Sequence, residues 1–204
     1  YFPIIGVTTN PSILAKEAKD LKETLKALKD LIGDDLEIHV QTTEEKADDI
    51  VREALELRQY FGENFHCKLH MTKNGLKACR KLSSKGVKTT VTTIFTPMQA
   101  MLAAEAGASY VAPYVNRLDN ITGDGVDVVA GIVEIFENFD METRVLAASF
   151  KNVQQVYECA RVGSHSATIA VDLLEASINH PYTEKSLVDF ESDWIKRYGD
   201  KKVV

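Results

Sequence analysis

The sequence feature that most constrains the fold is a regular alternation of short β-rich runs with longer runs of helical periodicity. Some short runs, such as 110–112, are apolar throughout, which is typical of strands covered on both faces. In 45–61, Ile50, Ala54 and Leu57 recur at helical spacing while charged residues fill the other positions. Alternation of this kind predicts an α/β protein with a parallel sheet.

The number of strand–helix units leaves two architectures open. Seven units fit an open doubly wound sheet, whereas a (β/α)8 TIM barrel needs eight. Because the chain starts with Tyr1 and not with methionine, we expect an N-terminally clipped barrel that lacks its first strand, in a single domain over 1–204. The predicted strands are 4–8, 37–42, 65–71, 87–93, 109–115, 144–149 and 167–171. The predicted helices are 20–32, 45–61, 74–85, 96–106, 125–138, 153–162, 172–179 and 184–198.

Composition excludes several classes of protein. The 204 residues are 45% hydrophobic and carry 24 basic and 30 acidic side chains, a net charge of -6, which argues against a nucleic-acid-binding surface. No apolar run is long enough to span a bilayer, so no membrane partner is expected. Cys67, Cys79 and Cys159 are scattered without metal-ligand or disulfide spacing. We expect free thiols, no metal and a cytoplasmic location.

Lys68 is the main candidate for chemistry. It lies at the centre of FHCKLHMT (65–72), which reads as a buried strand. Burial of an ammonium group is costly and lowers its pKa, and a desolvated lysine amine attacks carbonyl groups to form Schiff bases. The alternative is an edge strand whose lysine extends its amine to water.

Polar residues collect where the predicted strands end, the position of active sites in α/β barrels. Thr8, Gln41 and Thr92 each end such a strand. Arg117, together with Ser149 and Lys151 ahead of a helix, predicts a phosphate site. The alternative is that Arg117 pairs with Asp119 or Asp124 and that Lys151 points to solvent.

Three segments carry a resemblance to a known family. They are GVTTNPS (6–12), YVAPYVNR (110–117) and VLAASFK (145–151), and they resemble the transaldolase family, in particular its short-chain branch that includes fructose-6-phosphate aldolase. The similarity extends to FESDW (190–194) in the last helix. The resemblance implies a (β/α)8 barrel with an extra C-terminal helix, Schiff-base chemistry without cofactor or metal, and a homo-oligomer, a pentamer or decamer.

The resemblance also implies roles for individual residues. Lys68 matches the Schiff-base lysine, and Thr8 and Asn10 match groups that contact the substrate hydroxyls and carbon chain. The remaining matches are Gln41, Thr92 and Tyr114 for the catalytic water, and Arg117, Ser149 and Lys151 for the phosphate.

The implied substrates are sugar phosphates. The favoured activity is an aldolase that cleaves or forms fructose 6-phosphate from dihydroxyacetone and glyceraldehyde 3-phosphate. Gln41 and Tyr114 favour it because transaldolases typically carry glutamate and phenylalanine there. The alternatives are a transaldolase that moves dihydroxyacetone between sugar phosphates such as sedoheptulose 7-phosphate and glyceraldehyde 3-phosphate, and an inactive sugar-phosphate-binding homologue.

Two departures from the family pattern stand out. The family carries an acid/base aspartate on its first strand, and this chain begins after that point. His70 replaces the proline usual two residues after the lysine. On a strand, His66, Lys68 and His70 share one face. His70 either tunes the pKa of Lys68 and shuttles protons, or fills the space with its ring bonded to a neighbouring hydroxyl, which we favour.

Overall fold

The structure, a computed structural model, describes residues 2–17, 20–33 and 35–203. The chain forms two compact units, one that ends at Thr168 and one that begins at Ile169. All the described strands lie in the first unit. The second unit contains helices α9 (Val171–Ile178) and α10 (Pro181–Tyr198), so the predicted extra C-terminal helix is present.

Seven parallel strands form one sheet in which each strand pairs with the next strand along the chain. This order is the one a barrel requires and differs from the crossed order of a doubly wound sheet. The strands are β1 (Gly6–Thr8), β2 (Glu37–Gln41), β3 (Phe65–His70), β4 (Lys88–Ile94), β5 (Tyr110–Pro113), β6 (Arg144–Ala147) and β7 (Ser166–Ala167).

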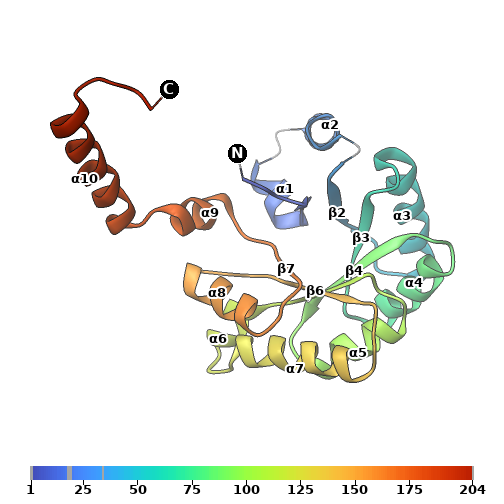
Figure 1. The fold of residues 1–204 in the computed structure, drawn as a ribbon. Coiled ribbons are helices and arrows are strands. Elements are labelled where there is room, and N and C mark those ends of the chain that lie inside the picture. The colour runs from blue at the N-terminus through green and yellow to red at the C-terminus, as the bar shows by residue number, and fades with distance from the viewer. Residues whose placement is uncertain (1, 18–19, 34, 204) are drawn as a thin grey trace. The chain divides into compact units, whose positions relative to one another are not determined.

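The helices of the first unit follow the strands, and the longer ones lie along the outer side of the curled sheet (Figure 1). Thr72, Thr96 and Asn152 cap three of them by accepting a backbone N–H with the side-chain oxygen. The helices are α1 (Pro11–Glu17), α2 (Leu21–Ile32), α3 (Ala47–Phe61), α4 (Lys73–Ser83), α5 (Pro97–Glu105), α6 (Val115–Asp119), α7 (Gly125–Asn138) and α8 (Val153–Arg161).

The sheet curls far enough for its two edge strands to approach each other. Thr8 ends β1, Thr168 follows β7, and their hydroxyl oxygens are 2.8 Å apart, at hydrogen-bond distance. Helices outside and a curled parallel sheet inside are the arrangement of a TIM barrel. The predicted fold class is therefore confirmed, with seven strands in the described part of the chain.

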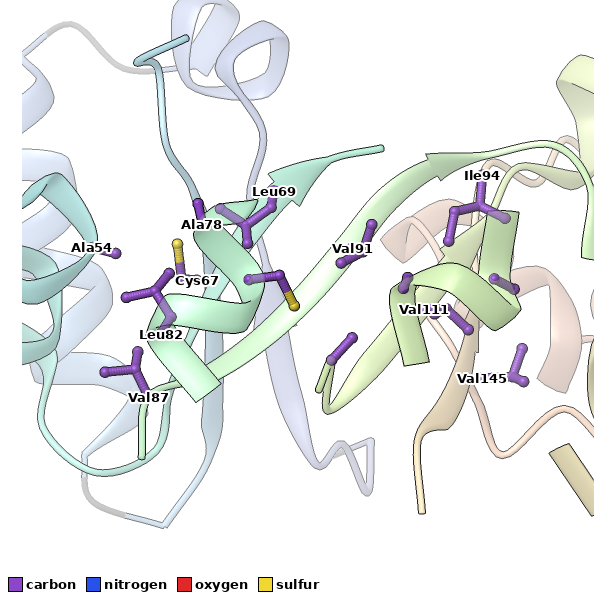
Figure 2. Packing of buried hydrophobic residues seen from close by; sticks show 14 of the residues in the cluster. Ala54, Cys67, Leu69, Ala78, Leu82, Val87, Val91, Ile94, Val111 and Val145 are labelled. Atoms are coloured by element: carbon purple, nitrogen blue, oxygen red, sulfur yellow. The ribbon is translucent and has the colours of Figure 1, made fainter. Parts of the chain in front are cut away.

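The hydrophobic core lies between the sheet and its helices. In Figure 2, Cys67 and Leu69 of β3 gather with Ala78 and Leu82 of α4. Cys67 and Leu69 therefore face the helices, which leaves the alternate residues His66 and Lys68, predicted to share one face, for the barrel interior. The three cysteines are buried and free, also as predicted.

Three local predictions were wrong. Residues 11–17 and 115–119 form short helices where none was predicted. The predicted strand over 167–171 is in fact the two-residue β7, and Val171 already begins α9. The strand is short because Ala170 is already the extended residue that precedes α9. Within the described residues, no helix is both long and apolar enough to cross a membrane.

Candidate active site

Lys68 lies inside the barrel, near the carboxyl end of β3. Its side chain is only 6% exposed, and Nζ donates a hydrogen bond to the backbone oxygen of Thr9 at 2.8 Å. Burial lowers the pKa of Lys68 from 10.5 to about 8. The expected burial is thus confirmed. At pH 7 about a tenth of the Lys68 amines are then neutral and nucleophilic, far more than for a lysine in water.

Gln41, Thr92 and Tyr114 come from three further strand ends. Gln41 ends β2 and is in register with Lys68. Thr92 lies on β4, and its hydroxyl donates to the Tyr114 hydroxyl at 3.2 Å. Tyr114 directly follows β5 and packs edge-on against Phe95. The structure thus joins Thr92 and Tyr114 in one polar pair, while Gln41 lies beside the lysine strand.

His70 contacts the candidate water-binding group directly. Its Nε2 is 2.8 Å from Nε2 of Gln41. Because an amide nitrogen can only donate, His70 Nε2 accepts and the proton is on Nδ1. Nδ1 lies 3.5 Å from the hydroxyl of Thr93, at a β-bulge where Thr93 has a φ of 59°. The predicted contact with a hydroxyl is present, and the contact with Gln41 was not foreseen.

Arg117 and Lys151 are the candidate phosphate-binding cations, and both are exposed. Arg117 stacks over the ring of Tyr114, with Cζ 4.8 Å from its centroid. The alternative pairing with an aspartate is absent, because Asp119 accepts from Gln155 and Asp124 caps α7. Neither cation forms a salt bridge within the described part of the chain.

The loop after β6 brings Ser149 and Lys151 to the start of α6. The backbone oxygen of Ser149 accepts from the N–H of Asn116 at 2.8 Å, and Ser149 has a φ of 64°. Gln155 of α8 donates to Asp119 of α6 at 2.6 Å. The structure therefore holds the three candidate phosphate residues, Arg117, Ser149 and Lys151, on two linked segments.

The two remaining candidates lie at the end of β1. The hydroxyl of Thr8 is paired with that of Thr168. Asn10 accepts the N–H of Ile13 through its side-chain oxygen at 2.8 Å. Asn10 therefore caps α1, which leaves its amide NH2 group as the donor available to a ligand.

Sequence reasoning missed a second polar cluster at the amino ends of the strands. It consists of Glu37 and His39 of β2, His66 of β3 and Tyr110 of β5. A side-chain hydrogen bond with His39 lowers the pKa of Glu37 to about 2, and burial lowers the pKa of His66 to about 3. The alternation of polar and apolar residues in 37–41 was the signal that could have revealed it.

Comparison with known proteins identifies the family. The family model described as transaldolase/fructose-6-phosphate aldolase matches residues 1–201. The chain belongs to the transaldolase/fructose-6-phosphate aldolase family. Two relatives named "Probable transaldolase" come from Thermoanaerobacter sp. (strain X514) and Thermodesulfovibrio yellowstonii. They are 42% and 43% identical, over 95% of this chain and 88% and 89% of theirs.

One solved structure is similar in fold. It is a mandelate oxidase mutant with a TM-score of 0.50 and 11% sequence identity, matched over 70% of this chain and 51% of that protein. The chain thus spans about half the length of that protein. The transaldolase/fructose-6-phosphate aldolase family is an enzyme family of carbohydrate metabolism, and the resemblance noted from sequence is confirmed.

Proposed function

We propose that the chain is a class I aldolase that cleaves and forms fructose 6-phosphate through a Schiff base on Lys68. The observation that carries this proposal is the buried Lys68 amine, whose pKa of about 8 leaves it partly neutral near neutral pH. Polar side chains from neighbouring strand ends accompany it. A nucleophile of this type needs no metal or cofactor to activate a ketose carbonyl.

Bond cleavage follows from the iminium. Lys68 adds to C2 of the ketose and the carbinolamine loses water, which leaves a cationic C=N group. A base removes the proton of the C4 hydroxyl, the C3–C4 bond breaks, and its electron pair moves toward the iminium nitrogen. Glyceraldehyde 3-phosphate leaves and an enamine of dihydroxyacetone stays on Lys68.

The phosphate is assigned to Arg117, Ser149 and Lys151. Support comes from two exposed cations without a salt bridge in the described residues, on segments joined by the bond from Asn116 to Ser149. Thr8 and Asn10 are assigned to the dihydroxyacetone end, since both lie directly next to Thr9, whose carbonyl binds the Lys68 amine.

Release of dihydroxyacetone requires protonation of the enamine and hydrolysis of the imine. We assign the water for these steps to Gln41, Thr92 and Tyr114. The Thr92–Tyr114 pair supports this assignment, because two hydroxyl groups 3.2 Å apart can exchange protons with a shared water. An apolar ring at position 114 would leave the enamine waiting for an acceptor aldehyde.

Transaldolase is the second candidate. The relatives that share about 40% of their residues with this chain bear the name "Probable transaldolase". In that reaction the same enamine on Lys68 attacks an acceptor aldehyde such as erythrose 4-phosphate, and no free dihydroxyacetone forms. We also propose a reducing, cytoplasmic setting for either activity, which the three free, buried thiols support.

A coupled assay with fructose 6-phosphate, with and without erythrose 4-phosphate, distinguishes these functions. Glyceraldehyde 3-phosphate released without the acceptor, and a borohydride-trapped adduct on Lys68, would support the aldolase. Release only with the acceptor would make the chain a transaldolase. No turnover and no adduct would overturn both and leave a sugar-phosphate-binding homologue.

A further inference from the structure

The polar cluster at the amino ends of the strands lies one side-chain layer below Lys68 in the barrel interior. Glu37 and His39 are two residues apart on β2 and therefore point to the same face of the sheet. His39 is in register with His66 of β3. The two imidazole rings stack, with centroids 4.4 Å apart and planes within 13°. The cluster therefore presents two imidazoles and one carboxylate at the amino-end side of the strands, away from the strand ends assigned to catalysis.

The spacing of the ligand atoms suits a metal ion. Nε2 of His39 is 3.4 Å from one carboxylate oxygen of Glu37, and Nε2 of His66 is 3.7 Å from the other. One atom from each of the three residues can be chosen so that all lie within 4.8 Å of one another. Ligands bound tetrahedrally to zinc at about 2.0–2.1 Å lie about 3.3 Å apart, so small movements would close the site.

Neighbouring groups already orient two of the three side chains. Nδ1 of His39 lies 2.8 Å from the hydroxyl of Thr90, which leaves Nε2 directed at Glu37. The Tyr110 hydroxyl donates to the Glu37 carboxylate at 3.2 Å. Metal-binding histidines and carboxylates are typically held by outer hydrogen bonds of this kind.

His66 is the member of the cluster whose burial is not explained by hydrogen bonds. It is 2% exposed, and neither ring nitrogen has a hydrogen-bond partner among the described residues. Buried polar atoms are nearly always paired, so an orphaned imidazole calls for a specific cause. A hydrogen bond from His39 to Glu37 gives only those two side chains a partner. A bound cation would also give a ring nitrogen of His66 a partner.

The cluster is reached from a cavity of about 600 Å³ that both Glu37 and His66 line. The charged side chains at its wall are Glu37, Glu105, Glu142, Lys88 and Arg144. Three carboxylates against two cations leave the wall net negative, which favours entry of a cation.

We propose that Glu37, His39 and His66 bind one divalent transition-metal ion of the zinc class. Two imidazoles and a carboxylate are a ligand set that zinc accepts, with the fourth position open to the cavity. The ion ties β2 to β3 below Lys68. This site lies outside the Schiff-base chemistry, and it differs from the sequence-based expectation of no metal.

The proposal is tested by measuring metal binding to the untagged chain, after dialysis against EDTA has removed any metal already bound. We expect equilibrium dialysis with Zn²⁺ to give one bound ion per chain, and Co²⁺ to give visible d–d absorption at the same stoichiometry. His66→Gln should abolish saturable binding. Thr90→Val, which removes only the partner of His39, should weaken binding about 10–100-fold.

His180→Gln is the matched control, because His180 belongs to the other compact unit and should leave binding unchanged. Circular dichroism checks that each variant folds, and Glu37→Gln replaces His66→Gln if the latter does not. The proposal is overturned if the wild-type chain shows no saturable binding, or if binding survives both ligand substitutions. Equal loss in His180→Gln would also overturn it.

Discussion

At the scale of single residues, reactivity depends on how much of Lys68 carries a neutral amine. Desolvation is the cause of its lowered pKa, and the hydrogen bond to Thr9 holds Nζ in place. Below about pH 8 the ammonium form dominates and cannot attack a carbonyl. The same burial that makes the group reactive costs the fold free energy at pH 7, because a charge is held out of water.

We predict that adduct formation on Lys68 follows this titration. The rate should rise about tenfold per pH unit below the pKa and level off above about pH 8. Borohydride trapping with fructose 6-phosphate and intact-mass detection across this range measures it. A midpoint near 10, the ordinary value for lysine, would contradict the burial argument.

Lys68→Met is the matched variant for this measurement. It should form no adduct.

The same variant also changes how stability depends on pH. Since the unfolded chain binds more protons at Lys68 between pH 8 and 10.5, the native lysine lowers stability most at and below pH 8. The variant should therefore unfold at a higher temperature than wild type at pH 7, and this gain should shrink as the pH rises toward 10.5. Equal melting temperatures at every pH would show that Lys68 is solvated.

His70→Ala tests whether His70 positions Gln41. Loss of one hydrogen bond, about 1 kcal/mol, should lower kcat/KM about fivefold. The pH at which kcat/KM is half-maximal should not move, because His70 acts through Gln41 and not on the proton of Lys68. A shifted pH profile would instead indicate proton transfer by His70. His180→Ala, in the other unit, is the control.

At the scale of elements, periodicity predicted what is long and regular. Helix 125–138 has the expected bounds. Gly86, Gly107 and Gly163 follow the ends of α4, α5 and α8, and all three have positive φ. The short helices at 11–17 and 115–119 were not predicted, because a helix of fewer than two turns shows no hydrophobic periodicity. Asn10 followed by Pro11 was the available signal for the first of them, a side-chain cap before a proline.

Gly75→Ala gives a prediction at this scale that runs against helix propensity. In an exposed helix interior this change stabilises by about 1 kcal/mol. Here a Cβ on Gly75 would overlap the backbone oxygen of His70, so α4 must move away from the end of β3. We expect a loss of unfolding free energy in urea and a lower kcat, since His70 contacts Gln41.

Gly131→Ala is the control for Gly75→Ala. It makes the same substitution within α7, where the nearest atom is a proline side-chain carbon at 3.2 Å. That change should alter the unfolding free energy by no more than about 1 kcal/mol. If Gly75→Ala is as stable as Gly131→Ala, the close packing of α4 on His70 is wrong.

At the scale of the whole molecule, the sequence indicated where polar groups end strands but not which of them touch. The hydrogen bond from Lys68 to Thr9 joins residues 59 positions apart in the sequence, and the one between Gln41 and His70 joins residues 29 positions apart. Such contacts depend on the register between strands, which one sequence does not display. For the same reason the stacking of His39 on His66 became visible only in the structure.

We propose, at this scale, that the homo-oligomer implied by the family resemblance forms through α10. Along α10, Leu187, Phe190, Trp194 and Tyr198 follow helical spacing and form one apolar stripe. Phe190 is 70% exposed, and a stripe of this kind on a surface helix is typical of a subunit contact. In this proposal, the contact between subunits lies on this face of α10.

If the proposed oligomer forms through this face, Phe190→Asp should dissociate it. Because a buried phenylalanine contributes about 1.5–3 kcal/mol, placing a carboxylate there should weaken association at least about tenfold. Sedimentation velocity over a concentration series measures the change. Ser192→Asp adds the same charge on the opposite face of α10 and should leave the mass distribution unchanged, since a helix turns about 200° over two residues. A wild-type chain that sediments as a monomer would exclude the oligomer, and equal dissociation by both variants would place the contact elsewhere or assign the effect to net charge.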